Sequence, residues 1–106
     1  MTPENTLSSL SRRLKVLADL GTRHPELPAP NVEICSVITD RITLAFHESP
    51  SAFRQWLTAL GIALHTVKGG AGATTAWLTA LYEVDGITLK LTSYTRLDVA
   101  ETDGAV

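Results

Sequence analysis

The sequence has little cysteine and no long apolar run, and both absences exclude a class of protein. Cys35 is the single cysteine and cannot form a disulfide within the chain, so the disulfide framework of a small secreted domain is absent. No apolar run approaches the roughly 18 residues of a membrane-spanning helix, and the first residues lack the apolar stretch of a signal peptide. We therefore expect a cytoplasmic protein with no membrane partner.

The chain also has little net charge. Nine lysines and arginines stand against eleven aspartates and glutamates, which gives a formal net charge of -2. Strongly electrostatic nucleic-acid-binding domains usually have a clear basic excess, so this balance disfavours that class but leaves room for a local basic patch. The length of 106 residues, with 44% hydrophobic residues, suits one globular domain with its own core.

Motifs for catalysis, metal binding and cofactor binding are missing. The three histidines, His24, His47 and His65, share no metal-ligand spacing, and one cysteine cannot complete a four-ligand zinc site. The segment 68–74 is rich in glycine, but its lysine precedes the glycines, the reverse of the order in a phosphate-binding loop. We expect a mobile hairpin loop there, no metal and no cofactor. No catalytic constellation is visible, which disfavours an enzyme.

Apolar periodicity predicts a first helix that begins near Thr2 and Pro3 and ends at Gly21. Its expected apolar stripe is formed by leucines at three- and four-residue steps, namely Leu7, Leu10, Leu14 and Leu17. We expect this stripe to pack on the chain's own sheet, because it is too short for a coiled coil.

A second helix is indicated more clearly. Ser49 is its expected cap, Pro50 its first residue and Gly61 its end. Its expected buried stripe consists of Phe53, Trp56, Leu57 and Leu60.

Five strands are expected, at 32–38, 41–47, 62–67, 74–84 and 87–97. A tight turn at Thr39-Asp40 would pair Val37 with Ile42 and Cys35 with Leu44, which makes Cys35 a buried, inert thiol.

The strongest turn signal is Asp85-Gly86, between the last two strands. A two-residue turn there fixes the pairing of the whole hairpin. It places Tyr82 opposite Leu89, Ala80 opposite Leu91, Leu78 opposite Ser93, Glu83 opposite Thr88, Leu81 opposite Lys90, Thr79 opposite Thr92 and Trp77 opposite Tyr94.

These elements predict an α+β fold of two layers, in which two helices lie on one face of a mainly antiparallel five-stranded sheet, in the order α-β-β-α-β-β-β. We expect one domain over residues 1–98 and an acidic, flexible tail over 99–106. The sequence leaves the order of the strands in the sheet open.

The outer face of the last hairpin is the candidate binding site. Its expected partner-binding residues are Trp77, Leu81, Lys90, Tyr94 and Arg96. Exposed apolar groups of this size mark contact sites, so the leading hypothesis is a non-catalytic interaction or regulatory module. It would associate with itself, as a homo-oligomer, or with an unidentified protein partner.

Two alternatives stay open. A nucleic-acid-binding regulator would use the same face, with bases on the aromatic rings and phosphates on Lys90 and Arg96. A small-ligand binder or enzyme would instead use a pocket between a helix and the sheet.

Two segments carry a resemblance, LADLGTRHPELPAPNVEI and FHESPSAFRQWLTALGI. They resemble small uncharacterised actinobacterial α+β proteins that are often encoded near phage-derived or plasmid-derived genes. The resemblance implies a cytoplasmic bacterial or phage setting. It implies no activity and transfers no functional residue, because the two segments are a helix end, a proline connector and a capped helix.

Overall fold

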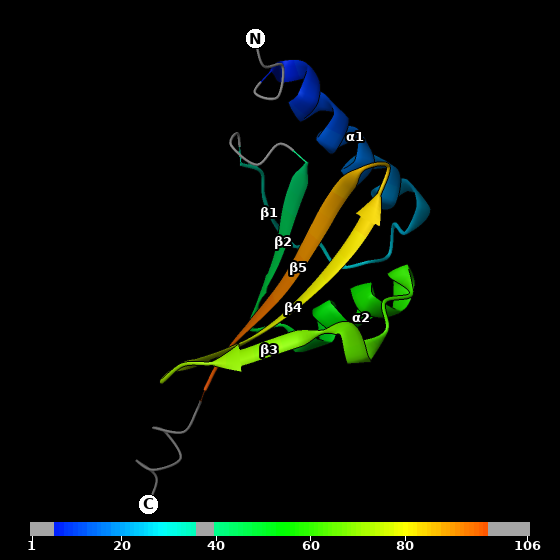
Figure 1. Ribbon diagram of the computed structural model, residues 1–106. Helices are drawn as coiled ribbons and strands as arrows, with labels where there is room; N and C mark the ends of the chain where they lie inside the picture. The colour runs from blue at the N-terminus through cyan, green and yellow to red at the C-terminus, as the bar shows by residue number, and fades with distance from the viewer. Residues whose placement is uncertain (1–5, 36–39, 98–106) are drawn as a thin grey trace, which may run out of the picture.

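The computed structural model describes residues 6–35 and 40–97, which form two helices and a five-stranded mixed sheet (Figure 1). Its elements are α1 (Leu7–Arg23), β1 (Asn31–Glu33), β2 (Arg41–His47), α2 (Pro50–Leu60), the 3-10 helix η2 (Leu64–Thr66), β3 (Lys68–Ala71), β4 (Thr75–Val84) and β5 (Ile87–Arg96). The predicted α+β class and the order of helices and strands are confirmed. The expected tail over 99–106 lies outside the described residues.

The strands lie in the order β1-β2-β5-β4-β3. Three of the four pairings are antiparallel, and β2 with β5 is parallel. A parallel pair needs a long connection between its strands, and α2, β3 and β4 all lie in that connection. The last strand of the chain's described part, β5, is therefore the central strand of the sheet.

Both helices cover the same face of the sheet. Alternate residues of β2, β4 and β5 point toward them, and these join residues of α1 and α2 in one core. The core consists of Val16, Leu20, Ile42, Leu44, Phe46, Phe53, Trp56, Leu57, Ala80, Ile87, Leu89 and Leu91. The other face of the sheet has neither helix on it (Figure 1).

The hairpin of β4 and β5 has the predicted register, residue for residue. Asp85 and Gly86 have φ values of 52° and 78°, and Val84 pairs with Ile87. Two successive residues of positive φ are what a tight turn of the type I′ class requires, and Asp-Gly supplies them at low cost. The turn therefore determines which side chains of this hairpin face the helices.

Helix α2 has the predicted ends, with Pro50 at its start and Gly61 in the left-handed conformation at its end. Ser49 occupies the N-cap position, but its hydroxyl donates to the carbonyl of His47 and makes no capping hydrogen bond. Phe53, Trp56 and Leu57 are buried, and Leu60 is half-buried. The indole N–H of Trp56 donates to the carbonyl of Pro28 at 2.8 Å, which ties α2 to the connector before β1.

The predictions for α1 are wrong in its ends and in its buried face. The helix begins at Leu7, after an N-cap Thr6 that accepts from the N–H of Ser9, and it continues past Gly21 to Arg23. Leu7 and Leu14 are exposed, whereas Arg13, Val16 and Leu20 are buried. Thr2 and Pro3 lie outside the described residues.

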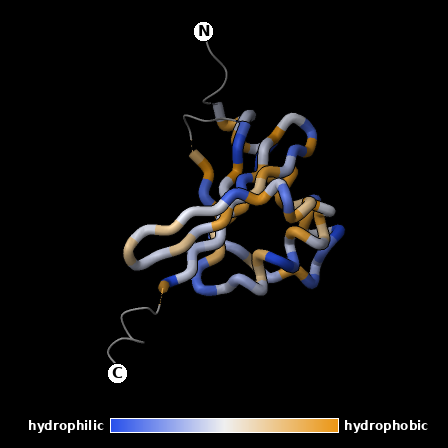
Figure 2. Tube along the Cα trace, turned by 60° about the horizontal axis from the view of Figure 1, so that its bottom comes forward, coloured by the Kyte–Doolittle hydropathy of each residue, from blue (hydrophilic) through white to orange (hydrophobic). Residues whose placement is uncertain are grey.

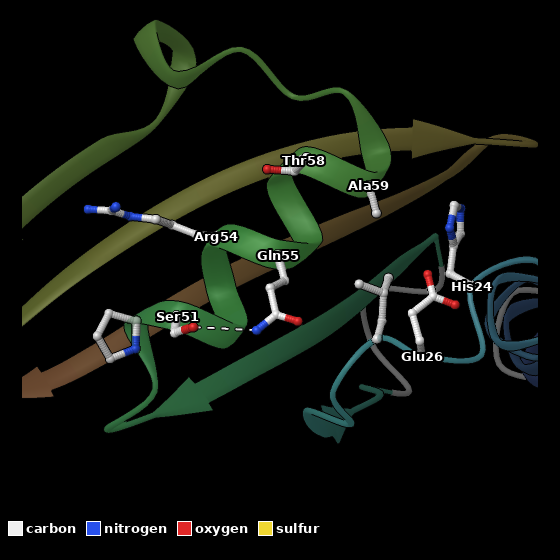
Figure 3. A pocket seen from close by; sticks show the side chains of 9 residues that line it. His24, Glu26, Ser51, Arg54, Gln55, Thr58 and Ala59 are labelled. Atoms are coloured by element: carbon white, nitrogen blue, oxygen red, sulfur yellow. Dashed lines mark hydrogen bonds between the residues drawn. The ribbon is translucent and has the colours of Figure 1, made fainter.

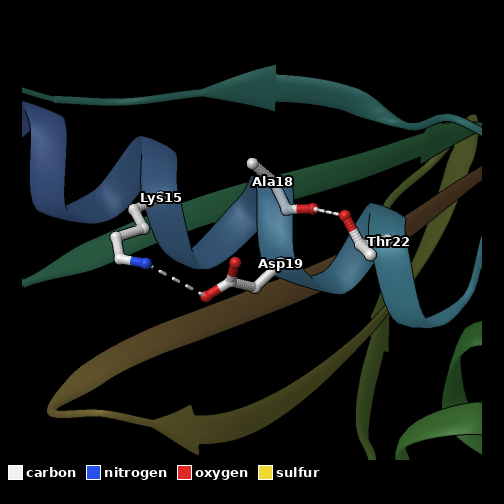
Figure 4. Close-up of polar contacts among 4 residues, drawn as sticks. All are labelled: Lys15, Ala18, Asp19 and Thr22. Atoms are coloured by element: carbon white, nitrogen blue, oxygen red, sulfur yellow. Dashed lines mark hydrogen bonds and ion pairs between the residues drawn. The ribbon is translucent and has the colours of Figure 1, made fainter.

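The reason is that only the C-terminal half of α1 packs on the core, through Val16, Leu17 and Leu20. The Nη1 of Arg13 donates to the carbonyl of Cys35 at 2.8 Å, so an arginine takes a buried place that the leucine pattern did not assign to it. On the solvent side, Lys15 contacts Asp19 at 3.9 Å and the Thr22 hydroxyl donates to the carbonyl of Ala18 (Figure 4).

The predicted pairing of the first two strands is also wrong. Strand β1 ends at Glu33, and Val32, not Cys35, pairs with Leu44. Cys35 is exposed and not a core thiol. Because the register of a hairpin follows from the length of its loop, assuming a two-residue turn at Thr39-Asp40 displaced every pair. Val37 lies outside the described residues.

The third correction concerns β3. The predicted strand 62–67 contains the η2 turn, and the glycine-rich segment expected as a mobile loop forms β3 itself. A Cβ at Gly69 would lie 2.9 Å from the Leu78 side chain, and one at Gly70 would lie 2.7 Å from the Trp77 indole. The glycines thus allow large β4 side chains to lie across a neighbouring strand.

We expect Gly86→Ala to lower the free energy of unfolding by about 1 kcal/mol, because alanine is strained at a φ of 78°. Gly21→Ala is the matched control, since Gly21 lies within α1 and a Cβ there meets nothing within 4 Å. It should stabilise the protein by about 0.5–1 kcal/mol. Urea denaturation of the two variants measures both signs, and equal effects would contradict the assignment of the turn.

Candidate interaction surface on the open sheet face

The candidate site is the sheet face opposite the helices, called here the outer face. All five predicted partner-binding residues occupy outward positions of β4 and β5, with Trp77 paired to Tyr94 and Leu81 to Lys90. Trp77, Leu81 and Tyr94 are 40%, 60% and 37% exposed. The apolar side chains predicted for this face are therefore open to solvent, and neither helix covers them.

Three ring side chains lie in one row across this face, called here the aromatic row. His47 of β2 pairs with Tyr94 of β5, and Tyr94 pairs with Trp77 of β4. The rings of His47 and Tyr94 are stacked, with centroids 5.0 Å apart and planes at 14°. On the far side, Trp77 pairs with Gly70 of β3, and its indole lies where a side chain at position 70 would be. The row thus has rings on three neighbouring strands and reaches over the fourth, β3.

The neighbours of the row restrict its rings. His47 covers one face of Tyr94, and Gly70 provides the floor on which the Trp77 indole rests. Rings held in this way lose less side-chain entropy when a partner binds, and this favours a contact surface.

Glu48, next to His47, has a structural role at the end of the row. Its carboxylate accepts from the N–H of Arg96 at 2.9 Å, and its own N–H donates to the carbonyl of Tyr94. It has a positive φ of 58°, which turns the chain out of β2 while the carboxylate continues the hydrogen bonding of β5. The adjacent His47 and Glu48 are therefore placed for different tasks, as a ring contact and as a backbone acceptor.

Charged side chains of the whole outer face are more basic than the chain overall. Outward strand positions hold four basic residues, Arg41, Lys68, Lys90 and Arg96, and two acidic residues, Glu33 and Glu83. None of the six forms an ion pair in the described part of the chain. The outer face therefore has a positive balance although the full chain has a net charge of -2.

The remaining outward positions of β2, β4 and β5 are mostly threonine. Thr92, at the centre of the sheet, is 3% exposed, and its hydroxyl oxygen has no hydrogen-bond partner among the described residues. The face thus combines a few large apolar groups with uncharged polar ones. This mixture is typical of interfaces between proteins that also exist alone in water.

Two grooves lie elsewhere, beside α2. The larger, of about 780 Å³, is lined by His24, Glu26, Leu27, Pro50, Ser51, Arg54, Gln55, Thr58 and Ala59 (Figure 3). In it Gln55 donates to the Ser51 hydroxyl at 3.4 Å, and Arg54 points away from His24 and Glu26. The smaller, of about 410 Å³, lies between α2 and β4 and is mostly apolar. Neither groove pairs a nucleophile with a hydrogen-bonded base.

Over residues 6–35 and 40–97, no three metal-ligating side chains come together. None of the helices in these ranges is long and apolar enough to cross a membrane.

Sequence reasoning missed His47, a member of the aromatic row, and Gly70, which lies beneath the Trp77 indole. Finding His47 required the parallel pairing of β2 with β5, and finding Gly70 required β3, which the sequence assigned to a loop. The alternation of inward and outward residues along β2 was a usable signal for His47. Because Ile42, Leu44 and Phe46 face the core, His47 must face outward.

Comparisons of the chain with protein-family models, with curated proteins and with solved structures found no match.

We expect Gly70→Ala to displace the Trp77 indole, because a Cβ at this position would lie 2.7 Å from the ring. The indole N–H resonance of Trp77 should shift in a ¹⁵N-correlated NMR spectrum, while that of buried Trp56 stays in place. Stability should fall by about 1 kcal/mol at most, since a half-exposed ring can move. Gly72→Ala is the control, because a Cβ there meets the same Trp77 ring only at 3.9 Å, an ordinary contact distance. An unchanged Trp77 resonance in Gly70→Ala would contradict the packing of the row.

Proposed function

We propose that this chain is a non-catalytic interaction module whose outer face binds a protein, either a second copy or another chain. The observation that carries the proposal is the exposed aromatic row on a sheet face that both helices leave open. Contiguous exposed apolar area on a small domain marks a contact site. Tryptophan and tyrosine at the centre of such an area are the residues that most often anchor binding.

The charges on this face indicate the character of the partner. On β5, Arg96 is the outward residue next to Tyr94, and Lys90 is the second outward residue on its other side. On β3, Lys68 pairs with Thr79, which is one outward position from Trp77. A partner with an apolar centre and an acidic margin would complement this pattern. Complementary margins increase association rates and select partners, while the central rings provide most of the affinity.

We expect Trp77→Glu to weaken association through the outer face by at least about tenfold, because it places a charge in the centre of the apolar contact. Sedimentation velocity over a dilution series measures self-association. Leu7→Glu is the matched control, since Leu7 is an exposed leucine of α1 away from the outer face. The control should associate like the unchanged chain, and both variants should have its circular dichroism spectrum.

A photo-crosslinking residue tests for a partner other than a second copy. Placed at Leu81 on the outer face, it should give a specific cross-linked product in cells, and this product should be lost when Trp77→Glu is added. Placed at Leu7, it should give none. Equal products at both positions, or a monomer at millimolar concentration with no product at Leu81, would overturn the proposal.

A second candidate is single-stranded nucleic acid, favoured by the basic balance of the same face. The geometry supports it less, because His47 covers one face of Tyr94 and leaves Trp77 as the open stacking platform.

If an oligonucleotide binds, the double variant Lys90→Gln with Arg96→Gln should weaken binding. The slope of the binding constant against salt concentration, both on logarithmic scales, should fall by the amount expected for about two phosphate contacts. Fluorescence anisotropy across salt concentrations measures this slope. Arg54→Gln is the control, because Arg54 is an exposed residue of α2 on the other side of the sheet. No binding at low salt would remove the nucleic-acid candidate and leave protein binding in place.

A further inference from the structure

The smaller groove, called here the apolar groove, lies between α2, the segment that contains η2, and β4. Its volume of about 410 Å³ is within the range of sites that hold small molecules. Apolar and polar residues alternate along much of the chain (Figure 2), whereas apolar side chains from three segments meet in this groove. They are Pro50, Phe53, Leu57, Leu64, Val67 and Leu78.

The groove has buried residues in its lining and an open side. Phe53 and Leu57 are buried, because the same side chains also belong to the core. Leu78 faces the helix side of the sheet, yet it is 43% exposed. Helix α2 packs over Phe46 of β2, which is two strands away from β4, and this position leaves Leu78 uncovered. A ligand in the groove would remove apolar surface from water that the fold leaves exposed.

Leu64 is held in place although its side chain is 72% exposed. The N–H of Val67 donates to the carbonyl of Leu64, and the N–H and hydroxyl of Thr66 both donate to the carbonyl of Ala63. These bonds fix the backbone of the η2 turn. The Leu64 side chain therefore lines the groove from a defined position, and less conformational freedom is lost when a ligand binds.

Arg54 is the charged residue in the lining of the groove. Its guanidinium forms no ion pair within residues 6–35 and 40–97. Helix α2 contains no acidic residue that could pair with it, and the carboxylate of Glu48, just before the helix, already accepts from the N–H of Arg96 at 2.9 Å. The N-terminal end of α2, where Pro50 lines the groove, adds positive potential. The margin of the groove is therefore positive.

We propose that the apolar groove binds an aliphatic carboxylate, with the carboxylate on Arg54 and the hydrocarbon chain on the leucines. The planar fork of a guanidinium matches the two oxygens of a carboxylate. The other lining side chains are apolar, so a ligand body with polar groups would lose its hydrogen bonds to water there. The site lies on the helix side of the sheet and is independent of binding at the outer face.

The larger groove, which Arg54 also borders, is less suited to this ligand. Its lining includes Glu26, whose carboxylate would repel an anion, and Arg54 points away from Glu26 (Figure 3). Most of its other lining residues are polar or charged. The charge and the apolar surface that an aliphatic carboxylate needs come together in the apolar groove.

Sodium decanoate, below the concentration at which it forms micelles, is the probe. In methyl-labelled protein the NMR resonances of Leu64 and Leu78 should shift along a saturable curve. Leu7 and Leu81 are the matched controls, since they are exposed leucines of α1 and of the outer face, and their resonances should stay in place. Equal shifts at all four leucines would overturn the site.

Chain length measures the contribution of the apolar lining. From hexanoate to decanoate, affinity should rise about twofold for each added methylene. This corresponds to half the free energy of complete burial, because the groove is open on one side. An affinity that does not change with chain length contradicts the proposal.

Arg54→Gln should weaken decanoate binding about tenfold, as expected for loss of a hydrogen bond to a charged group, and should leave decanol binding unchanged. Arg23→Gln is the matched control, because Arg23 is an exposed residue in the last turn of α1 and does not line the groove. Decylamine should bind at least about tenfold more weakly than decanoate. Decanoate affinity that is unchanged in Arg54→Gln, or decylamine that binds equally well, overturns the proposal.

Leu64→Asn should weaken the binding of decanoate and decanol alike, by about threefold or more. Leu7→Asn is its control, and both variants should fold because both leucines are exposed. Trp77→Glu should retain decanoate binding, which separates this inference from the outer-face proposal. Unshifted Leu64 and Leu78 resonances at millimolar decanoate overturn the inference and leave the outer-face proposal in place.

Discussion

The arrangement of the sheet depends on the turn at Asp85-Gly86, because it fixes which side chains of β4 and β5 face the helices. Ile87, Leu89 and Leu91 enter the core, and their alternate neighbours must then face outward. A slip of one residue would exchange the two sets and bury charges in place of leucines. Trp77 and Tyr94 are exposed for this reason, since the core positions of the same strands are filled by smaller apolar residues. The set of side chains on the outer face thus follows from which residues of the same strands enter the core.

Elements with short-range signals were predictable from sequence, and those that depend on distant contacts were not. The turn at Asp85-Gly86 and the ends of α2 follow from residues within one or two turns of each other. By contrast, the buried face of α1 depends on the sheet against which its C-terminal half packs and on the hydrogen bond from Arg13 to Cys35. The connector before β1 is held by the bond from Trp56 to Pro28. No local pattern contains these partners.

The same distinction explains how much of the candidate surface was found. Its five predicted residues lie on one hairpin, so a single turn was enough to align them. His47 and Gly70 come from β2 and β3, which join the hairpin from opposite sides through pairings distant in sequence. Glycine normally weakens a strand, so a run of glycines was assigned to a loop. Here the cost is offset by the Leu78 and Trp77 side chains that lie over Gly69 and Gly70.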